Sequence, residues 1–355
     1  MNLLPEAAAR IHIVRDLKIV DNDFDLLRAI GGECAGALSL LADDKHPSTA
    51  YNYTSLSDET LKRLLLHKGH VTSFVNEEDR PRLSLAGAQD KCPIYYHDEQ
   101  FYLPHDAAPS THIMKFEVTD YRNIPTYEYF LTSLASKLGL PVVECSFEHL
   151  DRHYFLLIKR FDRLMAHDNK ITRLHQEDFC QALGIGYEKK YQADGGPSFT
   201  DCYKLIQDVS TQPLLDSENL LKWQIFNVLA GNSDGHAKNL ALIYDENQNI
   251  KLAPFYDLVC TRAILRANAN LALSVGDCFN PNTLSIHDWE SLAEACDIKP
   301  AFINKTVGNL AQDLLDSYDE VNAAFEAQYG SYSALQRVKR VVVKQCQRTL
   351  KLLGN

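Results

Sequence analysis

The chain has 355 residues, a formal net charge of −11 and an apolar content of 45%. This length suggests about two domains, and the apolar content allows a sizeable core. The acidic balance excludes a protein that binds nucleic acid over its whole surface, although it leaves room for a local basic patch. The nine cysteines are scattered singly with no CxxC pair, which is typical of reduced core cysteines in a cytosolic protein rather than a zinc site or a disulfide framework.

Hydropathy predicts neither a membrane span nor a secretory signal. No apolar run approaches the roughly 18 residues that cross a bilayer, and residues 1–18 lack a continuous apolar core. We therefore expect a cytoplasmic protein without membrane contact.

In chain order, residues 1–70 are expected to be helical and loop-like, with a helix over 24–30 and a polar linker over 76–81. Residues 83–163 predict the order strand, strand, strand, helix, strand, strand, which is typical of a kinase small lobe. Its helix begins at Pro125 and ends at Gly139.

The remainder is predicted to be mainly helical, with one β-hairpin over 240–252. The expected helices span residues 176–183, 199–206, 217–230, 287–294, 300–318 and 333–353. We predict an α+β, two-lobed, protein-kinase-like fold. Its parts are a partial N-terminal subdomain (1–75), a small lobe with a phosphate loop (76–163) and a helical lobe with a catalytic loop (164–355).

The segment 231–239 carries the clearest chemical signal. Asp234 follows a long apolar helix, Asn239 comes five residues later, and Asp257 ends the hairpin that follows. Kinase-like enzymes place a catalytic base and two magnesium ligands in this order. Asp234-Gly235 alone favours a simple turn, but the whole ordered set favours a base with a Mg²⁺ site, in which His236 and Lys238 could contact phosphate oxygens.

Two further signals lie upstream. Lys115, within a predicted strand, could grip ATP phosphates with Glu128 as its partner, although an outward-facing strand lysine is an equal alternative. The small residues of Ser84–Lys91 could let backbone N–H groups approach phosphates, but a plain hairpin turn is the commoner meaning of such a segment.

These motifs, taken in order, resemble HipA-type kinases, the toxins of HipBA-like toxin–antitoxin systems. The resemblance rests on the two segments above and on Thr111–Lys115, Arg160–Arg163, Gln176–Asp178, Lys190-Tyr191, Asp194–Pro197 and Pro254–Asp257. It implies a kinase that uses ATP and Mg²⁺ to phosphorylate a serine in a protein, typically an aminoacyl-tRNA synthetase, and so stalls translation.

The same resemblance implies a role for each matching residue. Asp234 would be the catalytic base, Asn239 and Asp257 the metal ligands, and Ser84 a site of inhibitory autophosphorylation. The implied ATP-binding residues are Ala86, Gly87, Ala88, Gln89, Asp90, Lys91, Lys115, Glu128, Lys159, Arg160, Phe161, Gln176, His236, Lys238 and Tyr256.

The sequence departs from the family pattern at three places. Lys159 stands where glutamate is common, and Tyr127 stands where asparagine is frequent. The segment Asn2–Pro5 resembles a motif that normally follows a small N-terminal β subdomain. This indicates a shorter HipT-like type, in which a separate small HipS-like protein resembles the missing piece, beside a helix-turn-helix HipB-like antitoxin.

A basic stripe over residues 337–351 could contact the antitoxin or DNA, but a solvated helix face is the commoner explanation. We expect operator DNA to be reached only through the antitoxin. Two other functions stay open: a pseudokinase that regulates the antitoxin, and a kinase of a small molecule or lipid. The intact set of Lys115, Asp234, Asn239 and Asp257 favours an enzyme.

Overall fold

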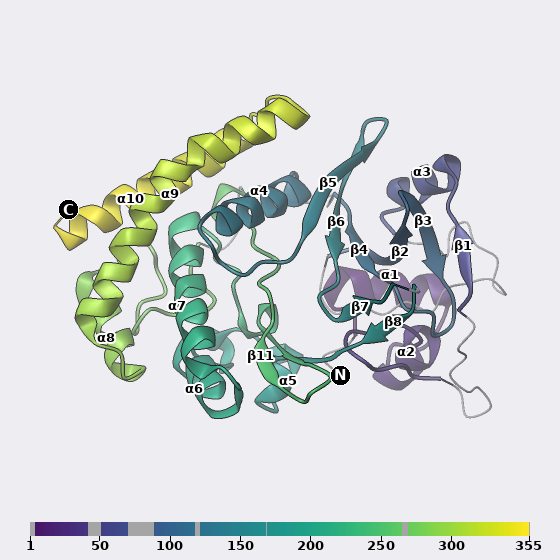
Figure 1. Ribbon diagram of the computed structural model, residues 1–355, viewed down its shortest axis with the longest axis horizontal. Helices are drawn as coiled ribbons and strands as arrows, with labels where there is room; N and C mark the ends of the chain where they lie inside the picture. The colour runs from purple at the N-terminus through teal and green to yellow at the C-terminus, as the bar shows by residue number, and fades with distance from the viewer. Residues whose placement is uncertain are drawn as a thin grey trace. The chain divides into compact units, whose positions relative to one another are not determined.

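The computed structural model describes residues 4–41, 51–69, 89–117, 121–167, 169–264 and 269–354. The chain divides into two compact units (Figure 1). Unit 1 comprises Met1–Pro125, Val143–Gln176 and Ile243–Asn247, and unit 2 comprises Thr126–Val142, Glu177–Leu242 and Gln248–Asn355.

Unit 1 is built on a six-stranded antiparallel sheet in the order β1-β3-β2-β4-β6-β5. Its strands are β1 (Tyr53–Ser55), β2 (Lys91–His97), β3 (Gln100–Pro104), β4 (His112–Lys115), β5 (Cys145–Leu150) and β6 (His153–Lys159). Helix α3 (Asp58–Leu66) turns Leu61, Leu64 and Leu65 onto the sheet. They join one hydrophobic core with Ile94, Met114 and other apolar residues of the strands.

Two helices and a hairpin complete unit 1. The helices are α1 (Ala7–Leu17) and α2 (Asp23–Ile30), and the hairpin pairs β7 (Arg163–Met165) with β8 (Ile171–Arg173). The Asn22 side chain accepts a hydrogen bond from Asp25 N at 2.8 Å and so caps the first turn of α2. Leu4, Leu26 and Ile30 form a small separate core there.

Unit 2 is mainly helical. Its helices are α4 (Ile124–Lys137), α5 (Phe179–Ala182), α6 (Phe199–Val209), α7 (Pro213–Ala230), α8 (Ile286–Ala295), α9 (Pro300–Tyr329) and α10 (Leu335–Leu353). Helix α7 is buried along most of its length, with Trp223 and Phe226 fully enclosed. A helix that is apolar on nearly all sides belongs in the centre of a core, so α7 is a rigid base for the loop that follows it.

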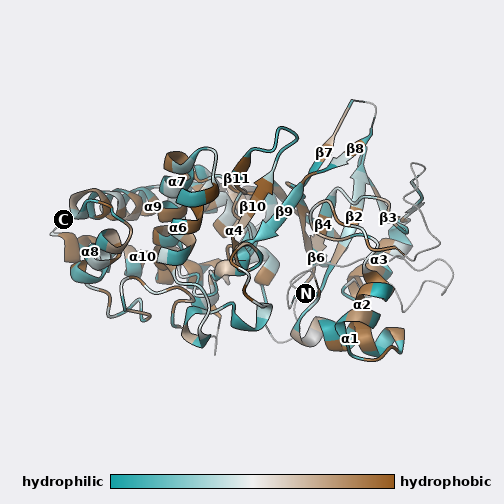
Figure 2. Cartoon of the chain, turned by 90° about the horizontal axis from the view of Figure 1, so that it is seen from below, coloured by the Kyte–Doolittle hydropathy of each residue, from teal (hydrophilic) through white to brown (hydrophobic). Residues whose placement is uncertain are grey.

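A three-stranded sheet has the order β11-β10-β9, with β9 (His175–Asp178), β10 (Ala241–Tyr244) and β11 (Ile250–Leu252). Figure 2 colours β10 as hydrophobic, in keeping with its buried residues Ala241 and Leu242. The buried carboxylate of Asp216 in α7 accepts hydrogen bonds from Leu252 N (2.9 Å) and Ser210 Oγ (2.6 Å). This contact fixes the end of β11, from which the chain runs to Asp257.

Most expected elements are confirmed, including β4, α4, the β5–β6 hairpin and the β10–β11 hairpin. The expectation of a helix from residue 176 was wrong for its first turn. Residues 176–178 belong to β9, and a capping box between Asp178 and Gln181 starts α5 only at Phe179. Strand β3 was missed because its hairpin turns at Asp98 and Glu99, which adopt positive φ without glycine or asparagine.

Two more elements differ. The short β7–β8 hairpin was not predicted. Helix α9 continues eleven residues past Tyr318 because Phe325, on this mostly polar stretch, is buried against aromatic rings of Tyr129 and Tyr332. The strand expected from Leu83 to the turn at Gly87, and the polar linker expected over 76–81, lie outside the described residues.

All nine cysteines are free thiols, as expected from their spacing. Among the described helices, none is both long and apolar enough to cross a membrane. The basic residues of α10 divide into two groups. Arg337, Lys339 and Arg348 contact Tyr127, Asp319 and the Leu284 carbonyl, whereas Arg340, Lys344 and Lys351 are exposed.

Candidate active site

The loop after α7 holds the backbone of Asp234 from both sides. The Asp234 carbonyl accepts hydrogen bonds from His236 N (2.9 Å) and Asn239 Nδ2 (3.0 Å), and Asp234 N donates to Asn232 Oδ1 at 3.2 Å. Most of the loop is buried, but Asp234 itself is exposed. A fixed backbone thus presents one carboxylate to solvent, which is what a general base for an incoming hydroxyl requires.

Glycine at position 235 is demanded by packing. A Cβ there would lie 2.6 Å from Asn227 Nδ2 on α7. The loop can therefore press against its supporting helix only with Gly235 beside Asp234. The glycine of the Asp-Gly pair thus serves a turn and also lets the loop backbone lie close to α7.

Asn239 ends the loop in a buried 3₁₀ turn (Ala237–Asn239), and its Nδ2 is committed to the Asp234 carbonyl. Because Nδ2 is the donor in this hydrogen bond, Oδ1 remains as the acceptor atom of the Asn239 side chain. Tyr256 Oη donates to the Lys238 carbonyl at 2.9 Å, so the segment before Asp257 is tied to the same turn. Phe255 N donates to the Pro141 carbonyl at 2.8 Å and further fixes this segment.

Asp257 itself has φ of +60°, a left-handed backbone that is uncommon outside glycine. Such conformations persist where surrounding contacts enforce them, and they are frequent at functional sites. Here the enforcing contacts are those of Tyr256 and Phe255.

His236 lies between the two carboxylates. Its side chain is buried, which lowers its pKa, while Asp234 and Asp257 favour the charged form and Lys190 opposes it. Both carboxylates are thus close enough to act on one imidazole. The net shift is downward, so His236 is a neutral ring at pH 7, and its Nδ1 is buried without a hydrogen-bond partner in the described structure.

These residues suit a hard divalent cation. The Asn239 Oδ1 atom and the Asp257 carboxylate are oxygen donors, which Mg²⁺ prefers, and the Asn239 amide is already turned so that its oxygen is available. Among the described residues, no three or more histidine, cysteine or acidic side chains are grouped so that they could hold a metal ion by themselves. Mg²⁺ commonly completes such a pair with substrate phosphates and water.

In unit 1, Lys115 is buried, so the alternative of an outward-facing strand lysine was wrong. The register places Lys91 of β2 directly opposite Lys115 of β4. Like charges opposite each other destabilise an antiparallel pair, and an anion beside them offsets that cost. Gln89 Nε2 donates to the Phe116 carbonyl at 3.2 Å, which fastens the chain just before β2 to the end of β4.

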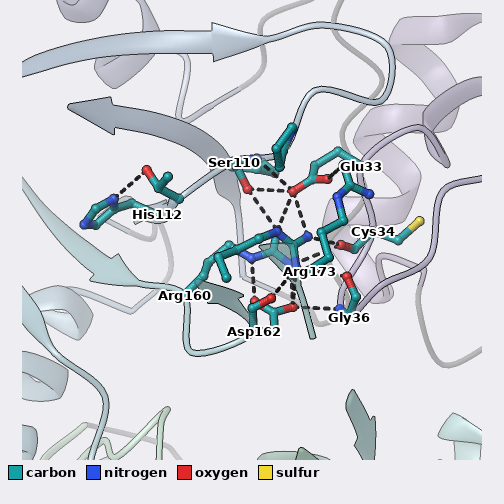
Figure 3. Close-up of polar contacts among 12 residues, drawn as sticks. Glu33, Cys34, Gly36, Ser110, His112, Arg160, Asp162 and Arg173 are labelled. Carbon is teal, nitrogen blue, oxygen red and sulfur yellow. Dashed lines mark hydrogen bonds and ion pairs between the residues drawn. The ribbon is translucent and has the colours of Figure 1, made fainter. Parts of the chain in front are cut away.

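A second group of charged side chains in unit 1 is joined by ion pairs and hydrogen bonds (Figure 3). We call it the Glu33 cluster; its members are Glu33, Ser110, Arg160, Asp162, Arg163 and Arg173. Glu33 Oε1 contacts Arg160 Nη1 and Arg163 Nη2, both at 2.9 Å. Burial alone raises the pKa of Glu33, but the arginines lower it below its usual range.

The cluster bears on three residues expected to bind ATP. The Arg160 guanidinium is committed to Glu33 and Asp162, and Gln176 Nε2 donates to Asp162 Oδ2 at 3.1 Å. Lys159 is exposed and paired with Glu144 at 2.8 Å. Lys159 N and Arg160 N also donate to the carbonyls of Glu144 and Thr111, both at 2.9 Å, so the side chains and the N–H groups of these two residues are engaged within unit 1.

The remaining expected residues are placed as follows. Phe161 is half-buried, Asp90 lies 3.9 Å from the ring of His12, and Glu128 of α4 is buried within unit 2. Ser84, Ala86, Gly87 and Ala88 lie outside the described residues. The structure thus brings together Asp234, His236, Lys238, Asn239, Tyr256 and Asp257 in unit 2, and Gln89, Lys91 and Lys115 in unit 1.

Sequence reasoning gave no role to Tyr191, whose hydroxyl donates to Asp234 Oδ1 at 2.7 Å. Its only signal was membership of the Lys190-Tyr191 and Asp194–Pro197 motif. Glu33, Arg163 and Arg173 were also missed as a group, since their partners lie up to 130 residues away in the chain.

Comparison with known proteins supports this fold. A family model described as HipA-like C-terminal domain matches residues 83–318, and one described as HipA N-terminal domain matches residues 1–41. The Y4mE protein of Sinorhizobium fredii is 34% identical over 325 residues, which cover 90% of this chain and 77% of that protein.

The serine/threonine-protein kinase toxin HipA of Shewanella oneidensis is 27% identical over 99% of this chain and 83% of that protein. A solved complex of Shewanella oneidensis HipA with HipB and its operator DNA contains a similar chain. That chain gives a TM-score of 0.84 at 25% identity, covering 99% of this chain and 85% of that one.

The antiparallel sheet of unit 1, the mainly helical unit 2 and the likeness to Shewanella HipA define a kinase with the two-lobed, protein-kinase-like fold. It phosphorylates serine or threonine in protein. The chain belongs to the HipA-like family of toxin kinases.

Proposed function

We propose that the chain uses ATP and Mg²⁺ to phosphorylate a serine in a protein, as the toxin of a bacterial toxin–antitoxin system. The observation that carries the proposal is the exposed Asp234 carboxylate on a fixed backbone, joined to Asn239 through the Asp234 carbonyl. Asp234 accepts the proton of the acceptor hydroxyl as that oxygen attacks the γ-phosphorus of ATP, and ADP leaves. Mg²⁺ held by Asn239 and Asp257 would neutralise negative charge on the phosphates of ATP.

The phosphates of ATP are the anion we assign to the opposed lysines of unit 1. Lys91 and Lys115 supply two positive charges on one face of the β2–β4 pair. His236 is proposed as a further contact to a phosphate oxygen, on the family resemblance. Replacing Lys115 by Met should therefore weaken ATP binding while the sheet stays folded.

The acceptor class is tested by labelling. Radiolabelled ATP is added to a bacterial lysate with wild-type protein, with Asp257→Ala, or with the surface control Asp319→Ala. We expect labelled serine in one or a few protein bands with wild type and control, and none with Asp257→Ala. Label that appears only in small molecules or lipids would instead support a small-molecule kinase, and absence of label in all three would support a pseudokinase.

An aminoacyl-tRNA synthetase is the acceptor we propose, on the family resemblance. Purified synthetases should differ sharply as acceptors in the same assay. One of them should incorporate close to one phosphate per chain, whereas equal slow labelling of all would contradict this choice.

Ser84 is proposed as a site of regulatory autophosphorylation. A phosphate adds nearly two negative charges, which would repel ATP from the adjacent loop. Intact mass measurement should show a species one phosphate heavier that is absent from Ser84→Ala and from Asp234→Ala.

A helix-turn-helix antitoxin is proposed as partner, since the similar Shewanella chain is in complex with HipB and operator DNA. A second, small HipS-like protein is proposed for the HipT-like type. Three strongly exposed apolar residues around α1 and α2, namely Ile11, Val20 and Phe24, support a further contact there. Co-expression of the native operon with tagged chain should recover both proteins, and Phe24→Asp should release only the small one.

A further inference from the structure

The catalytic loop is touched by a side chain from a distant segment. Tyr191 Oη lies 2.7 Å from Asp234 Oδ1, although the two residues are 43 positions apart. Within the described structure this is the sole hydrogen bond made by the Asp234 carboxylate, so one oxygen is held and the other stays open. A hydroxyl that donates to a carboxylate makes a short and strong hydrogen bond.

The loop that carries Tyr191 is shaped to present it. The Tyr191 carbonyl accepts hydrogen bonds from Asp194 N (3.1 Å) and Gly196 N (3.0 Å). Gly195 has φ of +82°, and a Cβ on Gly196 would lie 2.0 Å from the Lys189 carbonyl oxygen and 2.7 Å from that of Tyr191. Only two glycines let the chain fold back this closely beneath Tyr191.

This loop is also anchored to the catalytic loop by a separate route. The Gln192 side chain accepts from Ser274 N (2.8 Å) and donates to Ser274 Oγ (2.9 Å). Two residues earlier, Ala272 N donates to the carbonyl of Ser233, the residue before Asp234. The distance between Tyr191 and Asp234 is therefore set by backbone connections on both sides.

The Tyr191 ring has a second contact in the site. It lies edge-to-face on the His236 ring, with centroids 5.2 Å apart and an interplanar angle of 77°. The ring thus fixes the direction from which the hydroxyl reaches Asp234, and it covers one side of the buried imidazole.

We propose that Tyr191 is a positioning residue for phosphoryl transfer. It holds Asp234 Oδ1 so that Oδ2 faces the acceptor hydroxyl. The inference rests on the proposed function, because Asp234 must be the base for its orientation to matter. The opposite role, in which Tyr191 occupies the place of the acceptor hydroxyl and blocks it, predicts the opposite result on removal of its oxygen.

The test is Tyr191→Phe, which removes one oxygen and keeps the ring on His236. We expect kcat to fall about tenfold, with KM for ATP and for the protein acceptor within about twofold and an unchanged melting temperature. The matched control is Tyr329→Phe at the end of α9, which should keep wild-type kinetics. An unchanged kcat overturns the inference, and a raised kcat establishes the blocking role instead.

A second measurement does not depend on turnover. In protein labelled with ¹³C at tyrosine Cζ, the resonance missing from Tyr191→Phe identifies Tyr191. This resonance should move in Asp234→Ala, which deletes the acceptor, whereas that of Tyr329 should stay in place. A stationary Tyr191 resonance overturns the contact.

The two failures are distinguishable. If the wild-type protein shows no kinase activity, the proposed function is contradicted, and Asp234 is not a catalytic base for Tyr191 to orient. An active wild type with unaltered Tyr191→Phe kinetics leaves the proposed function intact and overturns only the present inference.

Discussion

The chain holds two networks of charged side chains, and they differ in whether any charge faces solvent. In the Glu33 cluster of unit 1, Glu33, Asp162, Arg160 and Arg163 are buried and paired with one another, and the partly buried Arg173 pairs with Glu33. In unit 2, Asp234 has a fixed backbone and one held oxygen, yet it is exposed. We call the Glu33 cluster the closed network, because its charges pair with one another and serve the folded structure. We call the Asp234 loop the open network, because it keeps a reactive carboxylate available to solvent.

The two networks also show two different physical causes of a lowered pKa. Burial raises the pKa of Asp162, but Arg160 and Arg163 bring it down to about 2, which reflects permanent ion pairs. The lowered pKa of His236 has the reverse origin, since burial favours its neutral form. A shifted value alone does not mark a functional site, whereas exposure and an unused acceptor do.

Breaking the closed network should have the largest effect on stability. Glu33→Ala would leave Asp162 as the one remaining carboxylate of the Glu33 cluster beside three arginines, so we expect a loss of about 3–5 kcal/mol in the unfolding free energy of unit 1. Urea unfolding with a unit 1 probe measures it. The exposed ion pair of Glu144 with Lys159 supplies the control, and Glu144→Ala should cost less than about 0.5 kcal/mol. Equal effects of the two variants would contradict the contrast between closed and exposed pairs.

His112, a half-buried histidine of β4, gives unit 1 a pH dependence. Burial, with help from Lys159, lowers the pKa of His112 to about 4. The folded value is below that of the unfolded chain, so the unfolded state takes up the proton first and stability is lost as pH falls below about 6.5. Between pH 7.5 and 5.0, wild type should lose about 2 kcal/mol more than His112→Gln. Parallel losses in the two proteins would contradict a half-buried neutral His112.

A substitution in the loop that carries Tyr191 should displace its hydroxyl from Asp234 without removing either polar group. Gly196→Ala forces a Cβ against two carbonyl oxygens, so we expect kcat to fall about tenfold at a stability cost of about 1–3 kcal/mol. In the control Gly184→Ala, φ of +68° strains the backbone but nothing lies near the new Cβ. That variant should lose stability and keep its kcat, and loss of kcat in both would mean that general strain, not the position of Tyr191, sets the rate.

The smallest effect on stability and on ATP binding is expected for Lys159 at the end of β6. Its side chain is about half exposed and forms an ion pair with Glu144. Lys159→Ala should change stability by less than about 0.5 kcal/mol and the Kd for ATP by less than about twofold. Isothermal titration with a nonhydrolysable ATP analogue measures the second value, and a tenfold weakening would show that this side chain reaches the nucleotide.

The sequence was sufficient for the elements whose signals are local. The helix before Gly231, the hairpin from Ala241 to Leu252 and the spacing of Asp234, Asn239 and Asp257 together predicted the large-lobe site. Period-2 burial and helix-capping residues are readable within a few positions, so these segments were placed correctly.

What the sequence could not provide are contacts between remote segments. Glu33 meets Arg160 from 127 positions away, and Tyr191 meets Asp234 across 43. Nothing within either segment distinguishes a buried arginine from an exposed one, so Arg160 was expected to face a nucleotide. Pairing of this kind follows from the closed tertiary structure and not from local propensity.

The most direct test of the open site is the kcat of Asp234→Asn. Asparagine keeps the shape of the side chain and an oxygen that can accept from Tyr191, but it cannot take the acceptor proton. We expect kcat for serine phosphorylation to fall at least about 10³-fold, with the Kd for Mg²⁺–ATP within about threefold of wild type. A kcat within tenfold of wild type would contradict the assignment of Asp234 as the base.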